Sequence, residues 1–518
     1  MPEVPSEAAP TFDPGENCWR ESRAAKGAFL LDSRAYFLAF RRAVLKAERE
    51  VIILAWDISQ DLELVRGPDG DDGYPAPLAD FLIAVLDERP DLTIRILLWD
   101  YSVVYLAERE WLPFSRWRNP GHPRLQLATD DAIDVGGSHH QKLVVIDGTL
   151  AFCGGMDLGL WRWDTGEHHP RDPRRINPDG ELYQPYHDLQ LALTGKVVDD
   201  LRELAAMRWQ RATGDALPPL GETGAAPWPD DLTVDFEDEP LAIALTFARY
   251  KEYEESRHIE RLHLEMIRAA RRYLYLENQY LSSHTLVEAL ADRLRDPDGP
   301  EVVLVLTRTA GWAEEKTLGI LRDRLLEILG EADEHGRLSS CFPHAEDVDG
   351  EESQVYVHAK LLIADDRMLL CGSANLSNRS MKVDSELDLA FLHDQPRPFI
   401  RRLRDDLLAM HFQVDRTEID RAIGNAGSLR GAIVELRRSG GHRLRVLRGG
   451  CNSPVQRRLA DTQLLDPDEP VSPARHLREA LDERREIEQG TPGNLRRWLT
   501  VTGWIAGLIV AGRALSRR

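Results

Sequence analysis

Two stretches of the chain carry the same order of apolar patterns. Each begins with apolar residues at the spacing of one helix face, such as Phe37, Phe40 and Val44, and continues with an apolar run that predicts a buried strand. A second helix and a second strand follow in each stretch. The first stretch has a helix around 37–44, a strand at 51–59, a helix at 77–86 and a strand at 94–100; the second has a helix at 260–272, a strand at 273–281, a helix at 285–294 and a strand at 301–308.

Continuous apolar strands that alternate with helices are typical of sheets covered on both faces. The chain has 518 residues, which is enough for two domains with their own cores. The pattern therefore predicts an α/β fold made of two similar halves.

A short polar motif, H-x-K-x4-D, stands at the same place in both halves, directly before a further apolar strand. The first copy is HHQKLVVIDGTLAFCGGMD over 139–157 and the second is VHAKLLIADDRMLLCGSAN over 357–375. His140, Lys142 and Asp147 recur 218 residues later as His358, Lys360 and Asp365. The same offset pairs Gly154 with Gly372, Gly155 with Ser373 and Asp157 with Asn375. A histidine, a lysine and a turn of small residues can attack and hold a phosphate, so two sets predict one site built from two halves.

An acidic residue follows each motif in a matched setting. Asp188 stands in HDLQLAL and Glu386 in SELDLAF. Asp188 lies about 20 residues farther from its motif than Glu386 does, because the first half carries an insert over 161–186 that is rich in Pro, Arg, His and aromatic residues. Long irregular loops in compact domains tend to be functional, and we expect this insert to face the substrate.

The charge balance narrows the kind of substrate. The formal net charge is −22, whereas proteins that bind nucleic-acid backbones usually show a basic face. We therefore do not expect a nucleic-acid partner. The five cysteines are few and widely spaced, and they form neither a disulfide framework nor a zinc site. Cys153 and Cys371 share one motif position and fit small buried strand residues.

Lysine is rare in this chain, which makes the motif lysines informative. There are eight lysines among 65 basic residues, yet both motif positions hold lysine. An ammonium is a compact charge that can close on a single phosphate oxygen, whereas a guanidinium is a planar fork. The lysines at positions 142 and 360 therefore indicate that the chemistry requires an ammonium group there.

Two histidines suffice for a two-step phosphodiester reaction. One neutral imidazole attacks phosphorus and forms a phosphohistidine, while the other, protonated, donates to the leaving alcohol and then activates water or a second alcohol. Lys142, Lys360 and Asn375 would hold the nonbridging oxygens. Asp188 and Glu386 would orient the histidines. No metal-ligand cluster is evident, and the chemistry needs neither metal nor cofactor.

Three residues near the motifs invite a second interpretation. Asp147 and Asp365 belong to the candidate catalytic set, but their place at strand ends favours a turn or a buried salt bridge. His139 adjoins His140, and in an alternating strand only His140 shares a face with Lys142.

The composition divides the chain into six parts. These are a tail over 1–25, a first lobe over 26–212, a Pro/Gly/acid-rich linker over 213–240, a second lobe over 241–415, a helical extension over 416–490 and an apolar tail over 491–518. The extension contains an arginine-rich segment, HRLRVLR over 442–448, for which a packed or solvated strand is the commoner case.

The C-terminal tail leaves the location of the protein open. Residues 498–512 are 15 residues without a charge, flanked by arginines, and a helix of that length spans about 22 Å against a hydrocarbon core of about 30 Å. A marginal tail anchor, an interfacial helix and a helix docked on the body all fit. No secretory signal is visible, so we expect a cytoplasmic or a peripheral, tail-anchored protein.

Both motifs resemble the HKD signatures of the phospholipase D superfamily, over roughly residues 26–415. HHQKLVVID, GGMDL, RWDT, LENQYL and VHAKLLIADDRMLLCGSANLSNRSM followed by DSEL resemble the phosphatidylcholine-hydrolysing branch. Cardiolipin synthases typically carry two membrane-spanning helices before the catalytic region, and none is visible here. The resemblance implies two αβαβα lobes related by a pseudo-two-fold axis, with the active site at their interface.

The resemblance also implies a ping-pong mechanism, with His140 as the nucleophile and His358 as the general acid and base. Where the second copy has Asn375 the first has Asp157, an anionic and therefore poorer phosphate ligand. Ser373 is the other small residue that we count with the phosphate-supporting set.

Four functions compete on the sequence. The first is a phospholipase D that releases the headgroup of phosphatidylcholine-like lipids, with water or an alcohol as acceptor, at a phospholipid surface. The second is a cardiolipin synthase-like phosphatidyltransferase, the third a nuclease-like phosphodiesterase, and the fourth a scaffold with a decayed site, which two complete motifs disfavour. One chain is sufficient for one site.

Overall fold

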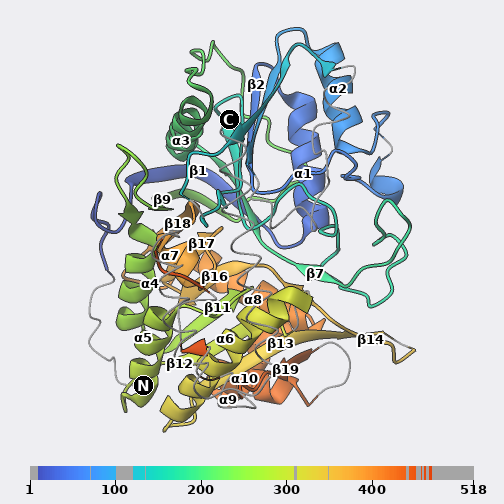
Figure 1. Cartoon of the computed structure of the whole chain (residues 1–518). Helices are drawn as coiled ribbons and strands as arrows, with labels where there is room; N and C mark the ends of the chain where they lie inside the picture. Colours follow the sequence, from blue (N-terminus) through green and yellow to red (C-terminus); the bar gives the residue numbers. More distant parts are fainter. Residues whose placement is uncertain are drawn as a thin grey trace, which may run out of the picture.

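The fold is described from a computed structural model, which covers residues 10–70, 72–100, 121–134, 136–308, 312–347, 349–438 and 443–450, and beyond them 457, 460, 461 and 466–469. Two α/β lobes lie one above the other (Figure 1). The predicted two-lobed α/β fold is confirmed, and nearly every predicted helix and strand is present within a few residues of its expected bounds.

The first lobe is a mixed sheet with helices on both faces. Its elements are β1 (Arg20–Leu30), α1 (Ser33–Lys46), β2 (Glu50–Ala55), η1 (Gly67–Gly70), α2 (Leu78–Glu88), β3 (Thr93–Trp99), β4 (Leu125–Asp130), β5 (Leu143–Ile146), β6 (Leu150–Gly154), β7 (Tyr186–His187), β8 (Gln190–Thr194) and α3 (Lys196–Thr213). Strand pairing gives the order β4-β3-β2-β5-β6-β8-β1, with β2, β3 and β4 parallel.

The second lobe repeats this arrangement. Its elements are β9 (Phe236–Phe247), β10 (Ser256–Arg257), α4 (His258–Ala269), β11 (Tyr273–Asn278), α5 (His284–Arg295), β12 (Glu301–Leu306), α6 (Trp312–Ala332), β13 (Leu338–Glu346), β14 (Glu352–Gln354), β15 (Tyr356–Val357), β16 (Lys360–Ala364), β17 (Met368–Gly372), α7 (Asn378–Lys382), β18 (Glu386–Leu392), α8 (Pro398–Phe412), α9 (Arg416–Ala426), α10 (Leu429–Leu436) and β19 (Arg443–Val446). The order β13-β12-β11-β16-β17-β18 matches that of the first lobe, strand for strand.

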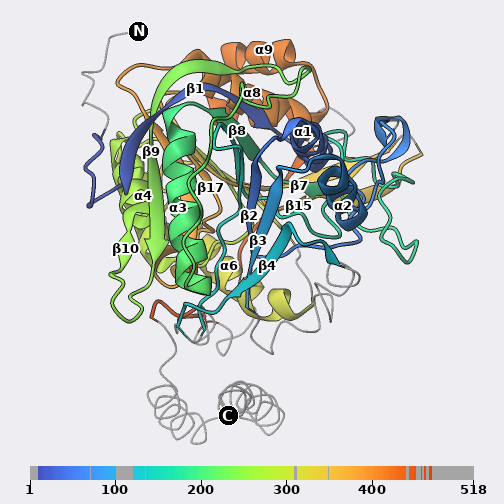
Figure 2. The same ribbon diagram turned by 90° about the horizontal axis from the view of Figure 1, so that it is seen from above.

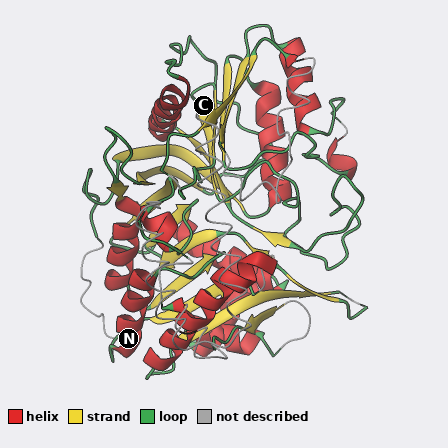
Figure 3. Cartoon of the chain, viewed as in Figure 1, coloured by secondary structure: helices red, strands yellow, loops and turns green. Residues whose placement is uncertain are grey.

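Strand β9 joins the two lobes, because it pairs with β1 on one side (Figure 2) and with β18 on the other (Figure 1). The alternation of side chains along each strand then sorts the core into layers. Ile53 of β2 faces α1 and α2, whereas Ile52 and Leu54 face the interior between the lobes. That central layer contains residues of both lobes and is closed by α3, α8, α9 and α10, while α4, α5 and α6 cover the outer face of the second sheet (Figure 3).

Three predicted boundaries need correction. The tail over 1–25 ends earlier, because β1 begins at Arg20 and pairs with β9 from that residue on. The linker over 213–240 is shorter, because β9 begins at Phe236. The second lobe does not end at 415, because Ile419 of α9 and Ile433 of α10 lie in the central core.

The arginine-rich segment is a packed strand, since β19 pairs with β13. Among the described residues, none of the helices combines the length and the apolar character needed to cross a bilayer. The apolar segment 498–512 and Cys451 lie outside the described residues.

Candidate active site

The two H-x-K motifs meet at the interface between the lobes, each at the start of a central strand. Lys142 directly precedes β5, and Lys360 is the first residue of β16. Backbone hydrogen bonds cross the interface at both motifs. The His140 N–H donates to the Ser385 carbonyl at 2.9 Å, and the His358 N–H donates to the His187 carbonyl at 2.7 Å. Each motif is therefore held by the chain just before the acidic residue of the opposite lobe.

The carboxylates reach across the same interface. Glu386 of the second lobe lies 3.0 Å from Nδ1 of His140 in the first, and Asp188 of the first lobe lies 2.6 Å from Nδ1 of His358 in the second. Both carboxylates are fully buried. A carboxylate on Nδ1 fixes the tautomer, so Nε2 of each ring is left for chemistry. The predicted orienting role of the two acids thus takes a crosswise form.

The two carboxylates are held by different groups. This explains why the same motif position is Gly155 in the first copy and Ser373 in the second. Ser373 donates from Oγ to Oε2 of Glu386 at 2.5 Å. At the matching Gly155, an added Cβ would lie 2.2 Å from Oδ1 of Asp188, so no side chain fits there. Asp188 instead accepts from the Tyr186 hydroxyl at 3.1 Å. Ser373 therefore supports Glu386, and its part in holding a phosphate stays a prediction.

The motif lysines are buried beside the histidines. Lys142 donates to the His140 carbonyl at 2.9 Å, and its Nζ lies 3.2 Å from Oδ2 of Asp157. Asp157 is therefore the counter-ion of Lys142, and its part in holding a phosphate stays a prediction. Lys360 donates to the Gln279 side-chain oxygen at 3.1 Å and to the His358 carbonyl.

Asn375 is the matched residue of the second lobe. It is 5% exposed, and within the described part of the chain its amide oxygen has no hydrogen-bond partner. Buried polar atoms are seldom left unpaired, so this amide is available to a bound group.

Burial dominates the electrostatics of the site. It lowers the pKa of His140 and of His358 well below the ordinary value, with a further contribution from the motif lysines. It also raises the pKa of Glu386 to about 8 and that of Asp188 above its usual range. Each histidine–carboxylate pair therefore favours a form without net charge, in which the two groups share one proton. An incoming anion can change which of the two groups holds that proton.

Asp147 and Asp365 lie away from the chemistry, which corrects their place in the candidate catalytic set. The Asp147 carboxylate accepts from the backbone N–H groups of 48, 49 and 50, and that of Asp365 accepts from those of 271, 272 and 273. Both have positive φ, +51° and +57°, as expected for turn residues. They fix the entry of β2 and β11, the structural duty favoured on the sequence.

His139 lies behind the site, as the strand alternation predicts. Its Nδ1 pairs with the Ser385 hydroxyl at 2.8 Å, and its Nε2 lies 3.2 Å from Asp130. Arg208 of α3 binds the same Asp130 at 2.7 Å. This cluster supports the segment before Glu386.

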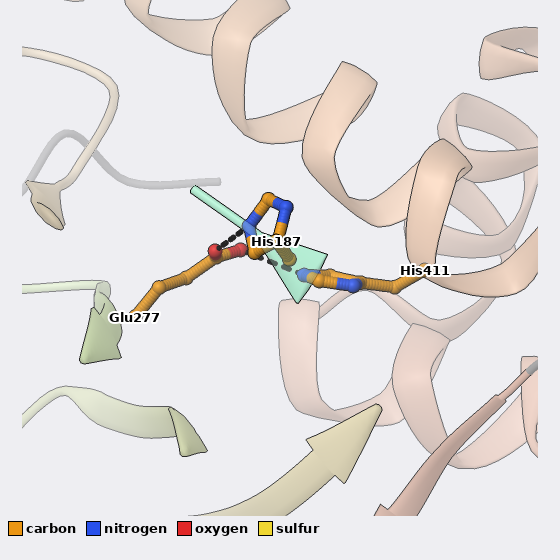
Figure 4. Close-up of side chains that lie close together, drawn as sticks. All are labelled: His187, Glu277 and His411. Carbon is orange, nitrogen blue, oxygen red and sulfur yellow. Dashed lines mark hydrogen bonds and ion pairs between the residues drawn. The ribbon is translucent and has the colours of Figure 1, made fainter. Parts of the chain in front are cut away.

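A second buried cluster, His187, Glu277 and His411, was not predicted (Figure 4). His187 and Glu277 are 90 residues apart and Glu277 and His411 are 134 apart, so no local spacing reveals them. Their side chains are types that can bind a metal ion. However, both Nε2 atoms already bond to the carboxylate, and both Nδ1 atoms lack the partner that metal-ligating histidines almost always have. The residues fit a hydrogen-bonded cluster better than a metal centre.

The chain is similar to several known proteins. A family model described as "Cardiolipin synthase, PLD-like domain" matches residues 263–410. Phospholipase D A of Dictyostelium discoideum is 25% identical over 431 residues, which covers 70% of this chain and 32% of that protein. Phospholipase D1 of Saccharomyces cerevisiae is 25% identical over 456 residues, which covers 70% of this chain and 26% of that protein. The chain thus spans a third or less of the length of these two relatives.

Among solved structures, the phosphatidylserine synthase of Haemophilus influenzae Rd KW20 has a similar fold. Its TM-score is 0.50 at 15% identity, and the match covers 74% of this chain and 86% of that one.

Proposed function

This chain belongs to the phospholipase D superfamily, and we propose that it cleaves the distal phosphodiester of phosphatidylcholine-like glycerophospholipids to phosphatidic acid and the free headgroup. The observation that carries the proposal is the crosswise site, in which each motif histidine is held by a carboxylate of the other lobe. In the proposed reaction His140 attacks phosphorus through Nε2 while His358 protonates the leaving oxygen. His358 then takes a proton from water or an alcohol, which displaces the histidine.

The cations and the amide of the site support the developing negative charge. Lys360 has no carboxylate partner among the described residues, so its charge is available to the phosphate. Because Lys142 forms an ion pair with Asp157, it stabilises negative charge on the phosphate less strongly. Asn375, which matches Asp157 in the second motif, offers an amide group as well. These groups act in a site with little water, where electrostatic stabilisation is large.

A mass-spectrometric assay tests this function. The protein is incubated with vesicles that contain several phospholipid classes, with and without ethanol, and the lipids are identified. We expect phosphatidic acid in water and phosphatidylethanol in its place when ethanol is present. A product with two phosphatidyl groups and no phosphatidic acid would instead favour the phosphatidyltransferase. Cleavage of single-stranded DNA or RNA at low salt, with no change in any lipid, would contradict both.

The insert over 161–186 is the proposed contact with the lipid surface. Five large apolar side chains are exposed in the described part of the chain, and three of them belong to this insert: Trp161 at 42%, Ile176 at 38% and Leu182 at 46%. The insert ends at Tyr186, whose ring lies 5.5 Å from that of His358, so it leads directly into the site. Aromatic and aliphatic side chains at a bilayer interface bind by burying their apolar area.

Vesicle sedimentation tests the contact. Replacing Trp161, Ile176 and Leu182 together by serine should weaken binding to vesicles and spare cleavage of a short-chain monomeric substrate. The matched control is Met207→Ser, which removes an apolar side chain of equal exposure, 42%, from α3. Deleting residues 495–518 measures the contribution of the apolar tail separately. Unchanged binding by the triple variant would contradict the role of the insert.

A further inference from the structure

A buried carboxylate is linked to His358 through His187. Glu277 of β11 is placed between two imidazoles, with Oε2 at 2.6 Å from Nε2 of His187 and Oε1 at 2.9 Å from Nε2 of His411 (Figure 4). The hydroxyl of Tyr275 donates to the same carboxylate. All three members of the cluster are fully buried. The cluster joins β7 of the first lobe to β11 and α8 of the second.

His187 occupies the position that controls both contacts of His358. Its carbonyl accepts the His358 N–H at 2.7 Å, and the next residue, Asp188, bonds to the His358 ring at 2.6 Å. The short strand β7 also pairs in parallel with β15, which leads into His358. A shift of the His187 side chain would therefore move the carboxylate on which the tautomer of His358 depends.

The cluster carries a balanced pair of charges. Although burial raises it, His411 and His187 hold the pKa of Glu277 well below its ordinary value. Although burial lowers it, Glu277 raises the pKa of His187, while burial lowers the pKa of His411. These shifts favour a carboxylate on Glu277 beside a protonated His187. Other titratable groups also face the cluster: Asp188, Asp32, His168 and Tyr275.

The other histidine is supported differently, through Ser385, His139 and Asp130. In the first lobe, Leu143 follows the motif lysine and pairs with Leu54 of β2. In the second lobe, Leu361 follows the motif lysine and pairs with Glu277 of β11. The residue before Glu386 is Ser385, which makes a hydroxyl hydrogen bond to His139. The two lobes thus share the crosswise carboxylates but differ behind them.

We propose that Glu277 is a positioning residue for His358: by holding His187, it fixes Asp188 on the ring of the general acid and base, whereas Leu54 stands at the matching strand position of the first lobe. The cluster distinguishes the two histidines of an otherwise repeated site. Where turnover is the readout, this inference rests on the proposed phosphodiesterase activity. The arrangement of the cluster itself does not.

Glu277→Gln tests the inference, since it keeps the size of the side chain and removes its charge. His187 then loses its counter-ion, and Asp188 is held less firmly. We expect kcat to fall about 10- to 100-fold, the size of effect that a misplacement of about 1 Å produces, with KM nearly unchanged. The pH limb that belongs to His358 should move to lower pH, because a weaker carboxylate contact stabilises its imidazolium less.

The matched control is Asp366→Asn. Asp366 is another buried carboxylate of the same lobe, and it bonds to Arg404 of α8 at 2.7 Å. It does not touch the segment 186–188. This variant should lose stability and leave the pH profile of kcat in place. Tyr275→Phe provides a milder variant that removes one hydrogen bond to Glu277, and it should shift the same limb less.

A second readout needs no substrate. Diethyl pyrocarbonate modifies neutral imidazole, so the pH midpoint of modification, followed by peptide mass spectrometry, reports the protonation of each histidine. In Glu277→Gln the midpoint of His358 should fall and that of His140 should stay. If wild-type protein cleaves no phosphodiester, the proposed function fails and these midpoints still decide the inference. Unchanged His358 midpoints in both Glu277→Gln and Tyr275→Phe would overturn the inference. A stoichiometric metal ion that is present in the purified protein and lost in Glu277→Gln would also overturn it.

Discussion

The crosswise carboxylates make a prediction that no single-lobe arrangement makes: an acid variant should behave like the histidine variant of the opposite lobe. Asp188→Asn is the sharpest case. In the wild type, Oδ1 of Asp188 accepts from the Leu189 N–H at 2.7 Å, and Oδ2 faces Nδ1 of His358 at 2.6 Å. The Leu189 N–H can only donate, so it selects the oxygen of the asparagine. The NH₂ group is then turned toward His358.

That reversal changes the tautomer of His358. Its Nδ1 must accept, so the ring proton resides on Nε2, where it blocks general-base catalysis. Loss of a charge-assisted hydrogen bond costs about 1.5–3 kcal/mol, or roughly 10- to 150-fold. Where an orienting aspartate of a catalytic histidine is changed to asparagine, the wrong tautomer brings the loss to about 10⁴-fold. We expect turnover by Asp188→Asn to fall by about 10³-fold or more.

The assay separates the two steps of the reaction. With a phosphatidyl ester of p-nitrophenol, the leaving group needs no acid, so formation of the phosphohistidine depends on His140 alone. Asp188→Asn and His358→Ala should both release a burst of about one p-nitrophenol per chain and then stop. Glu386→Gln and His140→Ala should show no burst. If Asp188→Asn abolished the burst and Glu386→Gln retained it, the crosswise assignment would be wrong.

Three further predictions follow from the same geometry. Asp147→Asn replaces one of the two oxygens that accept from three backbone N–H groups by an NH₂ group, so it should lower the free energy of unfolding by about 1–3 kcal/mol, measured by urea denaturation, and leave the burst intact. Burial lowers the pKa of Lys360 to about 7, so its charge is present below that pH and is lost above it; kcat/KM should fall as the pH rises through about 7, and Lys360→Arg, which stays charged, should remove this fall. Gly155→Ala places a methyl carbon 2.2 Å from a carboxylate oxygen of Asp188 and should impair turnover severely, whereas Gly330→Ala in α6, with open space around its Cα, should retain activity and stability.

The sequence predicts the repeated part of the molecule well. The two lobes and the pairing of His140 with His358 follow from two apolar patterns and one motif, because hydrophobic periodicity is a local property. The alternation of strand residues also separates His140 from His139 correctly. The predicted bounds of the lobes are less accurate, because β1 and β9 are defined by their pairing with each other across the chain rather than by a local pattern.

The roles of the polar residues depend on distant partners and were predicted less well. The contact of Ser373 with Glu386 and that of Asp157 with Lys142 are not evident from the sequence. The role of Glu277 needs His187 and His411, and the three residues come from three separate elements. No spacing along the chain encodes such contacts, because they are created only when the lobes meet.

The most direct test of the central claim is to trap the intermediate and identify the residue that carries it. His358→Ala is mixed with the p-nitrophenyl substrate, quenched in base, where phosphohistidine survives, and digested for peptide mass spectrometry. The account predicts one phosphatidyl adduct, on His140, and none in His140→Ala treated in the same way. An adduct on His358 in the His140→Ala protein, with none on His140 in the other variant, would contradict it.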